Sequence, residues 1–317
     1  MFSVSALGEL LIDFTDAGIS ASGQRLFERN PGGAPANVLV ALERLGHKTA
    51  FLGKVGCDMH GDFLRKTLEE QGVDTTGLIS DPDTFTTLAF VALSEDGERT
   101  FSFARKPGAD TRLTTDELAY NVIEDSHVFH VGSLSLTNEP VRSATHAALA
   151  YARDHGCVLS YDPNYRANLW SSVEEACEQM RSVVPYMNLM KLSDEECVLL
   201  TDKSDPQEAA ASLLAQGPSV VAVTLGEGGA YVCCADGGME VPAFPAVAVD
   251  ATGAGDSFWG GFLAAFCESS KKPEELTLDD IAQFARKGNA VASLCVRKRG
   301  AIPAMPTRAE VEELLNQ

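Results

Sequence analysis

Residues 249–258 read Val-Asp-Ala-Thr-Gly-Ala-Gly-Asp-Ser-Phe, and this stretch says more about the chain than any other. Small residues stand directly ahead of Asp256, where an apolar helix with Phe258, Phe262 and Phe266 at every fourth position begins. The first N–H groups of a helix lack internal partners and carry partial positive charge, so they bind anions. The stretch therefore predicts a backbone anion site beside Asp256. An ordinary helix capped by this aspartate is the alternative.

A second glycine-rich stretch, residues 30–37, reads Asn-Pro-Gly-Gly-Ala-Pro-Ala-Asn and precedes a helix expected from Ala34 to a stop at Gly46. Asn37 is a polar side chain in the first turn of this otherwise apolar helix, and a solvent-facing Asn is the alternative. Together and in this order, the two stretches resemble the motif regions of the ribokinase-type (PfkB) carbohydrate kinase family. The resemblance covers nearly the whole chain, and the pair is more specific than either stretch alone.

The composition is that of a globular protein, since 45% of the 317 residues are hydrophobic and suffice for a sizeable core. The formal net charge of -20 argues against a nucleic-acid or anionic-membrane partner, because either needs a basic surface. The eight cysteines show no CxxC spacing and mostly lie among apolar residues, as buried free thiols do. We find no leader and no apolar run of roughly 18 residues, and expect a cytoplasmic protein without a membrane span.

Apolar strand-like runs alternate with helical patterns along most of the chain. Strands are expected at residues 4–14, 48–55, 127–132, 158–161, 187–192 and 220–225, and helices at 34–46, 61–71, 139–155, 173–183, 194–200 and 206–216. This rhythm predicts an α/β fold with a doubly wound, mainly parallel sheet flanked by helices, which the resemblance makes ribokinase-like. We expect residues 1–317 to form a single kinase domain, with ligands at the carboxyl ends of the strands.

Two segments, about residues 15–30 and 84–106, break this rhythm. In residues 84–106, side chains alternate between apolar and polar on either side of a turn at 94–98, which predicts a half-buried β-hairpin. In the family that the chain resembles, such strands form a small sheet, the lid, that covers the sugar and often pairs with a second subunit. The resemblance therefore implies a lid and a homodimer formed through it, while a plain surface hairpin is the alternative.

The sugar side of the expected site begins with Asp13. It follows the apolar residues 10–12 at the end of the first expected strand, where a carboxylate must be exposed or bonded. In similar sugar kinases this aspartate binds two sugar hydroxyls. By the same resemblance, Gly32 and Gly33 let the sugar approach the backbone, and Asn37 binds another hydroxyl. A capping or turn role for Asp13 is the alternative.

Residues 101–110 fit the pattern FxFxRxPGAD, which resembles the fructokinase branch of the family. The resemblance implies that Phe101 and Phe103 close over the apolar face of the sugar ring. It also implies that Arg105 binds sugar hydroxyls or shields phosphate.

Residues 162–166, Asp-Pro-Asn-Tyr-Arg, follow an expected strand and fit the same branch. The resemblance places Asn164 and Arg166 on the substrate side. The planar donors of Arg166 suit a pair of phosphate oxygens, and a surface arginine is the alternative.

Sugar phosphorylation is mainly positioning and electrostatic stabilisation. By the resemblance, Asp256 accepts the proton of the attacking hydroxyl, and the N–H groups of Ala254, Gly255 and Asp256, in the turn that follows Gly253, form the anion hole for the γ-phosphate of ATP. Mg²⁺ is expected to enter with ATP. Ser193 replaces the Asn of the family's NxxE motif, and Glu196 keeps its implied contact to Mg²⁺ through water.

The resemblance also implies a nucleotide site and a site for a monovalent cation. The nucleotide-binding residues would be Lys191, Thr224, Gly226, Gly228 and Asn289. Asn289 would contact adenine, although a tightly packed core helix explains it equally well. The cation, usually K⁺, would lie at Asp250, Thr252 and Gly300.

Other classes of enzyme lack their usual motifs. The pattern GxxxxGK[ST] is absent, as is GxGxxG, which argues against a P-loop ATPase and a dinucleotide oxidoreductase. The resemblance implies an ATP-dependent kinase that transfers the γ-phosphate to the 6-hydroxyl of D-fructose. Two alternatives stay open: a sister kinase for 2-keto-3-deoxygluconate or aminoimidazole riboside, and a sugar-binding relative without catalysis.

Overall fold

A computed structural model of the chain describes residues 1–93 and 99–317, with the side chains of 1–91 and 102–317. The strands are β1 Phe2–Leu7, β2 Leu11–Ile19, β3 Arg25–Gly32, β4 Thr49–Gly56, β5 Asp74–Asp81, β6 Leu88–Leu93, β7 Arg99–Ala104, β8 Ser126–Gly132, β9 Val158–Asp162, β10 Leu189–Ser193, β11 Val220–Thr224, β12 Ala230–Cys234 and β13 Gly237–Val241. The α-helices are α1 Ala34–Arg44, α2 Met59–Glu70, α3 Tyr120–Glu124, α4 Val141–Asp154, α5 Val173–Val183, α6 Asp194–Thr201, α7 Pro206–Leu214, α8 Ala254–Ser269, α9 Leu278–Cys295 and α10 Arg308–Leu315.

The main sheet has nine strands in the order β13-β12-β11-β10-β9-β8-β1-β4-β5. Neighbouring strands from β11 to β5 are parallel, and only β12 and β13 run antiparallel to their neighbours. Strand β1 lies between β4 and β8. From β1 the strand order therefore runs to β4 and β5 on one side and to β8 and the later strands on the other. Such a switch point leaves a crevice at the carboxyl ends of the strands, where ligands bind in open α/β sheets. The predicted α/β class is confirmed.

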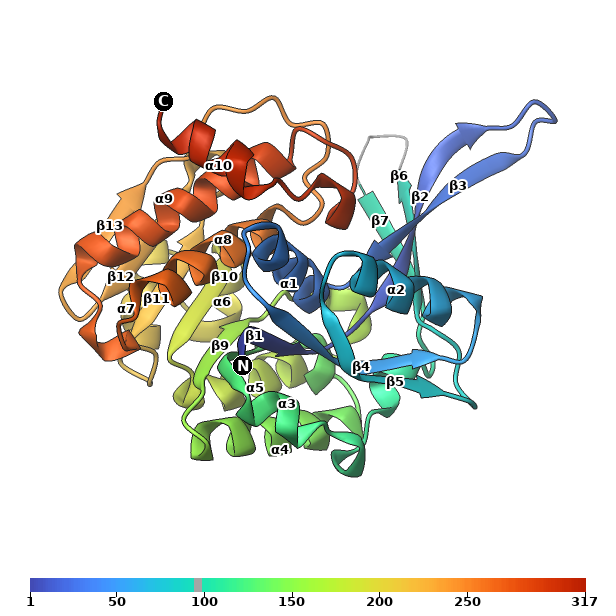
Figure 1. Cartoon of the computed structure of the whole chain (residues 1–317), viewed down its shortest axis with the longest axis horizontal. Coiled ribbons are helices and arrows are strands. Elements are labelled where there is room, and N and C mark those ends of the chain that lie inside the picture. Colours follow the sequence, from blue (N-terminus) through green and yellow to red (C-terminus); the bar gives the residue numbers. More distant parts are fainter. Residues whose placement is uncertain (94–98) are drawn as a thin grey trace.

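Helices cover both faces of this sheet (Figure 1). One apolar cluster joins α1, α8 and α9 to one face, and the other cluster joins α3, α4, α5 and α7 to the opposite face. The expected stripe of phenylalanines on α8 is buried, with Phe262 fully enclosed. A Cβ at Gly260 would lie 2.6 Å from Ala41 Cβ, so this glycine of α8 allows close packing against α1. Within the described residues, no helix has the length and apolar character needed to span a bilayer.

A second sheet of four strands, in the order β3-β2-β6-β7, projects from one side of the molecule (Figure 1). Strand β2 runs antiparallel to β3 and parallel to β6, and β6 runs antiparallel to β7. These strands fall within or beside the two segments predicted as the lid. The turn predicted at residues 94–98 lies outside the described residues.

The prediction of one strand over residues 4–14 is wrong. Strand β1 ends at Leu7 in the main sheet, and β2 starts at Leu11 in the small sheet. Between them the chain passes close to the second glycine-rich stretch: a Cβ at Gly8 would lie 2.5 Å from Pro35 Cγ. Both halves of the run are buried, so an apolar pattern alone does not show the break. Asp13 consequently lies in the small sheet.

Candidate active site

A cleft of about 960 Å³ lies at the carboxyl ends of the parallel strands, with residues of both sheets in its lining. It brings together most of the predicted site. The predicted residues that line it are Asp13, Gly33, Asn37, Phe103, Asn164, Arg166, Lys191, Glu196, Thr224, Gly226, Asp250, Thr252, Gly253, Ala254, Gly255, Asp256 and Gly300.

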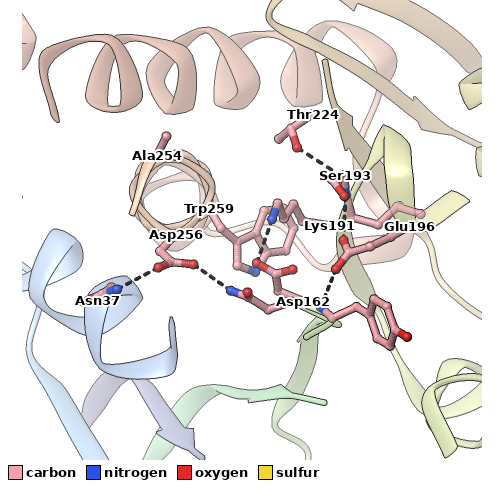
Figure 2. A network of polar contacts seen from close by, with 12 residues as sticks. Asn37, Asp162, Lys191, Ser193, Glu196, Thr224, Ala254, Asp256 and Trp259 are labelled. Atoms are coloured by element: carbon pink, nitrogen blue, oxygen red, sulfur yellow. Dashed lines mark hydrogen bonds and ion pairs between the residues drawn. The ribbon is translucent and has the colours of Figure 1, made fainter. Parts of the chain in front are cut away.

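Asp256 lies in the first turn of α8, with its carboxylate held by two amides (Figure 2). Asn37 Nδ2 donates to its Oδ2 at 2.8 Å, and Asn164 Nδ2 donates to its Oδ1 at 3.0 Å. Burial raises the pKa of Asp256, while the Asn37 amide and the charges of Lys191 and Arg166 oppose the rise. The result is an oriented carboxylate that is more basic than an exposed one. Asn37 Oδ1 is buried and has no hydrogen-bond partner among the described residues.

The turn before Asp256 leaves backbone donors facing the cleft. Gly253 is the N-cap of α8 and has a left-handed conformation, with φ of 76°. The N–H of Ala254 donates to the Ala251 carbonyl at 3.2 Å, and Ser257 N–H donates to the Gly253 carbonyl at 2.8 Å. Over the described residues, the N–H groups of Gly255 and Asp256 have no hydrogen-bonding partner. The predicted anion hole therefore narrows from three N–H groups to two.

A buried cation lies beside these N–H groups. Lys191 Nζ is 2.9 Å from Asp162 Oδ2, and a Cβ at Gly255 would lie 2.9 Å from the same Nζ (Figure 2). Burial alone would lower the pKa of Lys191, but the negative charges of Asp162, Glu196 and Asp256 raise it overall. Lys191 is therefore a fixed positive charge at the anion site of an acidic protein. Asp162 was not among the predicted site residues, although a carboxylate directly after an apolar strand is the signal that marked Asp13.

Helix α8 is anchored to the main sheet one turn beyond Asp256. Trp259 Nε1 donates to Ser160 Oγ at 2.9 Å, and Ser160 Oγ is 3.0 Å from His130 Nδ1. Burial lowers the pKa of His130 to about 3, so this histidine is neutral and structural. The anchor holds the start of α8 at the edge where β8 and β9 end.

Glu196 joins two segments of the cleft. Its Oε1 accepts from Tyr165 N–H at 2.6 Å, and its Oε2 accepts from Ser193 N–H at 2.8 Å (Figure 2). Thr224 Oγ1 donates to the Leu192 carbonyl at 3.3 Å.

Nowhere in the described part of the chain do three His, Cys, Asp or Glu side chains gather as a metal site.

Asp13 faces the cleft from the small sheet. Burial raises its pKa to about 6, the charge of Arg166 opposes this, and the charge of Asp256 adds to it. A Cβ at Gly32 would lie 2.2 Å from Asp13 Oδ2, and Gly33 has φ of 122° with a Cβ position 2.3 Å from the Glu9 carbonyl. Both glycines are therefore required by contacts within the protein itself.

Glu9 lines the cleft but was missed by sequence reasoning. It is only 4% exposed, its Oε1 accepts the N–H of Ala34 at 2.8 Å, and burial raises its pKa to about 7. Its signal in the sequence was a carboxylate inside the apolar run at residues 4–12, which was read as one strand. Glu9 holds the second glycine-rich stretch in place.

Asp250 ties together the two loops that were predicted to hold a monovalent cation. Its Oδ1 accepts from Thr252 N–H at 3.0 Å and from Thr252 Oγ1 at 2.7 Å. Its Oδ2 accepts from Gly300 N–H at 3.0 Å. The residues implied by the resemblance therefore meet next to the anion site.

Four predicted contact residues do not line the cleft within the described part of the chain: Gly32, Arg105, Gly228 and Asn289. Asn289 is 3% exposed and donates from Nδ2 to the carbonyls of Val241 at 2.9 Å and Pro242 at 3.1 Å. Its Nδ2 donors are thus engaged by backbone carbonyls, which fits the alternative of a packed core helix, and the contact to adenine stays a prediction. Gly228 lies in an exposed turn after β11.

The structure places Arg105 outside the cleft lining, away from the sugar contact that was predicted for it. Its guanidinium is buried and bound to Asp110, Thr137 and the Leu134 carbonyl. The side chain of Phe101 lies outside the described residues, so its predicted contact to the sugar ring stays a prediction.

The fold, with its switch-point cleft and small second sheet, is that of the ribokinase-like kinases. The chain belongs to the pfkB family of carbohydrate kinases, whose profile matches residues 1–308. The family resemblance inferred from the two glycine-rich stretches is confirmed.

Several relatives are similar over nearly their whole length. The chain is 44% identical to "Probable fructokinase-4" of Arabidopsis thaliana, covering 98% of this chain and 96% of the relative. It is 42% identical to "Fructokinase-1" of Zea mays, covering 99% of this chain and 98% of the relative.

The structure is also similar to solved kinases. A fructokinase with bound ATP from Xylella fastidiosa matches with a TM-score of 0.92 and 33% identity over 100% of this chain and 99% of that one. A fructokinase from Vibrio cholerae O395, in fructose, ADP and calcium ion bound form, matches with a TM-score of 0.89 and 32% identity over 99% of each chain. An aminoimidazole riboside kinase from Salmonella enterica, complexed with aminoimidazole riboside and an ATP analog, matches with a TM-score of 0.85 and 28% identity over 99% of each chain.

Proposed function

We propose that this protein transfers the γ-phosphate of ATP to the 6-hydroxyl of D-fructose. The observation that carries the proposal is Asp256, held by two amide donors beside the open N–H groups of Gly255 and Asp256 itself. The choice of fructose is supported by the names of the relatives and by the fructose and ADP in the Vibrio cholerae structure.

In the proposed reaction, Asp256 accepts the proton of the 6-hydroxyl as its oxygen attacks the γ-phosphorus. The bond from that oxygen to phosphorus forms, the bond from phosphorus to the bridging oxygen breaks, and ADP leaves with the electron pair. The N–H groups of Gly255 and Asp256, together with Lys191, stabilise the charge on the phosphoryl oxygens. A general base of this kind contributes roughly 10²–10⁴ to the rate.

We assign the sugar to the side of the cleft between Asp13 and Asp256. Asp13 accepts hydrogen bonds from sugar hydroxyls, and Phe103 covers the apolar face of the ring. Asn37 and Asn164 hold Asp256 and face the same space. Burial raises the pKa of both aspartates, and Arg166, whose charge opposes this rise, lies within reach of the transferred phosphate.

The nucleotide is assigned to the other side of the cleft, at Lys191, Thr224 and Gly226. Mg²⁺ fits as an ion carried in by ATP, because the described residues hold no carboxylate cluster, and Glu196 would order it through water. When bound, Mg²⁺ neutralises charge on the triphosphate.

We assign a monovalent cation to the loops that Asp250 joins to Thr252 and Gly300. Oxygen donors of these loops suit a hard cation. A Vibrio cholerae fructokinase double mutant has been solved in fructose, ADP and potassium ion bound form, which supports K⁺.

We also propose that residues 1–317 act as one kinase unit, as a homodimer through the lid, in the cytoplasm and without nucleic-acid or membrane partners. The exposed apolar side chains on β2, β3 and β6 support the pairing: Ile19, Leu26, Phe27 and Phe90. All eight cysteines are free, as in a reducing compartment.

A substrate panel tests the function. With ADP release as the readout, D-fructose should give a kcat/KM at least about tenfold above those of 2-keto-3-deoxygluconate and aminoimidazole riboside, as differential transition-state binding requires. Phosphorus NMR should place the phosphate on the 6-oxygen. No ADP release with fructose would overturn the proposal, and turnover of the riboside alone would favour the sister kinase that the Salmonella structure represents.

A further inference from the structure

The two legs of the β6–β7 hairpin join the body of the protein at a buried polar cluster. This cluster, which we call the clamp, consists of Thr87, Arg105, Asp110 and Thr137 with the carbonyl of Leu134. The four polar side chains are 1%, 7%, 4% and 6% exposed, in that order. Thr87 directly precedes β6, and Arg105 directly follows β7, so both legs of the hairpin end in the clamp.

The Arg105 guanidinium binds three groups at once. Its Nε donates to Asp110 Oδ2 at 2.7 Å, its Nη1 to Thr137 Oγ1 at 2.9 Å, and its Nη2 to the Leu134 carbonyl at 3.0 Å. Asp110 Oδ1 accepts from the Thr87 hydroxyl. A planar fork with fixed donor directions fits this arrangement, which an ammonium group does not reproduce. One ion pair therefore fastens both legs of the hairpin to the turn after β8.

The clamp is connected to the sugar side of the cleft in two ways. The Thr87 carbonyl accepts the N–H of Ile12 at 3.1 Å, and Ile12 precedes Asp13 in β2. Leu134, whose carbonyl binds Arg105, lines the cleft. The clamp thus lies between the strand that carries Asp13 and the turn at the end of β8.

The chain leaves no room for a side chain inside the clamp. A Cβ at Gly108 would lie 1.8 Å from Thr87 Oγ1 and 2.8 Å from Asp110 Oδ1. Any residue other than glycine at this position would push the Thr87 and Asp110 side chains apart. The sequence PGAD after the hairpin is explained in part by this close approach.

We propose that Arg105 is a positioning residue that sets the place of the lid and of Asp13 relative to the main sheet, without touching the sugar. The inference rests on the proposed function for its effect on fructose. Its mechanical part, the fastening of the hairpin, does not depend on the substrate. Removing one hydrogen bond of the clamp should loosen the hairpin and weaken sugar binding, while the nucleotide side keeps its structure.

Two matched variants test the proposal: Thr87→Val in the clamp and Thr49→Val as the control. Thr49 is also 1% exposed and also donates its hydroxyl to a carboxylate, Glu43 Oε1, at 2.9 Å, but it lies at the amino end of β4, away from the cleft. Hydrogen exchange of the β6 and β7 amides and steady-state kinetics are measured for both, after thermal melting has shown that each is folded. Thr137→Val, which removes the bond from Arg105 Nη1 and the bond that the Thr137 hydroxyl donates to the Leu134 carbonyl at 2.8 Å, is the second clamp variant.

For Thr87→Val, we expect β6 and β7 amide exchange and the KM for fructose to rise about tenfold, the scale of one charge-assisted hydrogen bond. The kcat and the KM for ATP should stay within about twofold of the wild type. Thr87→Ser, which keeps the hydroxyl, should show wild-type amide exchange and a wild-type KM for fructose. Thr49→Val should change neither the exchange nor this KM.

Unchanged amide exchange in both clamp variants would overturn the proposal that the clamp positions the hairpin. Equal changes in amide exchange in the clamp and control variants would also overturn it. A wild type that does not phosphorylate fructose would overturn the proposed function instead, and the exchange rates would still decide the mechanical part.

Discussion

Asp13 places function and stability in conflict. Burial raises its pKa from 3.8 to about 6, so the folded protein binds this proton more tightly than the unfolded chain does. Stability therefore falls as pH rises from about 4 to about 6, and the full cost is present above pH 6. An ionised carboxylate accepts hydrogen bonds from sugar hydroxyls at both oxygens, whereas a protonated carboxyl donates from one of them, which explains why an unfavourable carboxylate would be kept in the cleft.

Replacing Asp13 by Asn removes that cost. We expect Asp13→Asn to raise the free energy of unfolding at pH 8 by on the order of 1 kcal/mol, because solvent contact in the cleft reduces the full effect. The gain should vanish at pH 4, where the wild-type carboxyl is protonated. Denaturant unfolding at both pH values checks this, and a destabilised variant at pH 8 would contradict it. Its kcat/KM for fructose should fall at least about a hundredfold.

The same pKa predicts the pH profile of the wild type. Protonation of Asp13 removes an acceptor for sugar hydroxyls, so kcat/KM for fructose should decrease as pH falls below about 6. The raised pKa of Asp256 acts in the same direction, since a protonated base does not accept a proton. A pH–rate profile with its acid limb near pH 4, the ordinary range of a carboxyl, would show that neither group is perturbed in the working enzyme.

At the scale of elements, the start of α8 separates two kinds of glycine. Gly253 has φ of 76°, and its Cβ position lies 2.6 Å from Ala301 Cβ, so Gly253→Ala strains the backbone and the packing. A Cβ at Gly255 meets only the end of the Lys191 side chain, with Nζ at 2.9 Å. Gly253 is therefore needed for the backbone conformation and packing, and Gly255 for the position of the Lys191 ammonium group.

Alanine at the two positions should separate these effects. We expect Gly255→Ala to keep the wild-type stability and lower kcat about tenfold, because Lys191 moves away from the anion site. Gly253→Ala should lower the free energy of unfolding by about 1–2 kcal/mol. Denaturant unfolding and ADP-release kinetics measure both, and equal loss of stability in the two variants would argue against the distinction.

Regular elements could be predicted well from sequence because each carries its own pattern of burial. The parallel strands are continuous apolar runs, and helices such as α4 and α5 have one apolar face, so periodicity locates them. The break after Leu7 could not be predicted, since its cause is the approach of Pro35 to Gly8 in space.

Side-chain direction was the second limit of sequence reasoning. Arg105 and Asn289 have the donors that a ligand needs, but the protein's own carboxylates and carbonyls use those donors. Residue type shows what a side chain can bind, and only the fold shows what lies next to it.

At the scale of the whole molecule, the lid should join two chains. Phe27 and Phe90 contact each other edge to face on the small sheet and are 43% and 38% exposed. We expect Phe27→Asp to shift the protein from dimer to monomer in light scattering, because a charge in an apolar interface is costly to bury. Its KM for fructose should rise several-fold, since the partner supports the lid. A wild type that is monomeric would contradict this assignment.

The site is assembled from distant parts of the chain. Asn37 and Asp256, 219 residues apart, are hydrogen-bonded, so the two glycine-rich stretches meet at one carboxylate (Figure 2). Sequence reasoning predicted that they serve one site, but not that an amide of the first orients the carboxylate of the second. Asp162 and Glu9 each had a signal in the sequence, a carboxylate beside or inside an apolar run, but their partners, Lys191 and Ala34, are neighbours only in the folded chain.

The central claim is that Asp256 takes the proton of the sugar hydroxyl beside a backbone anion site. The most direct test is the kcat of Asp256→Asn, with the affinities for fructose and for a non-hydrolysable ATP analogue measured by calorimetry. Asparagine keeps the size of the side chain and removes its basicity, so we predict a kcat at least about a hundredfold lower and affinities within a few-fold of the wild type. A variant with near-normal kcat would contradict the account and assign the base to another group.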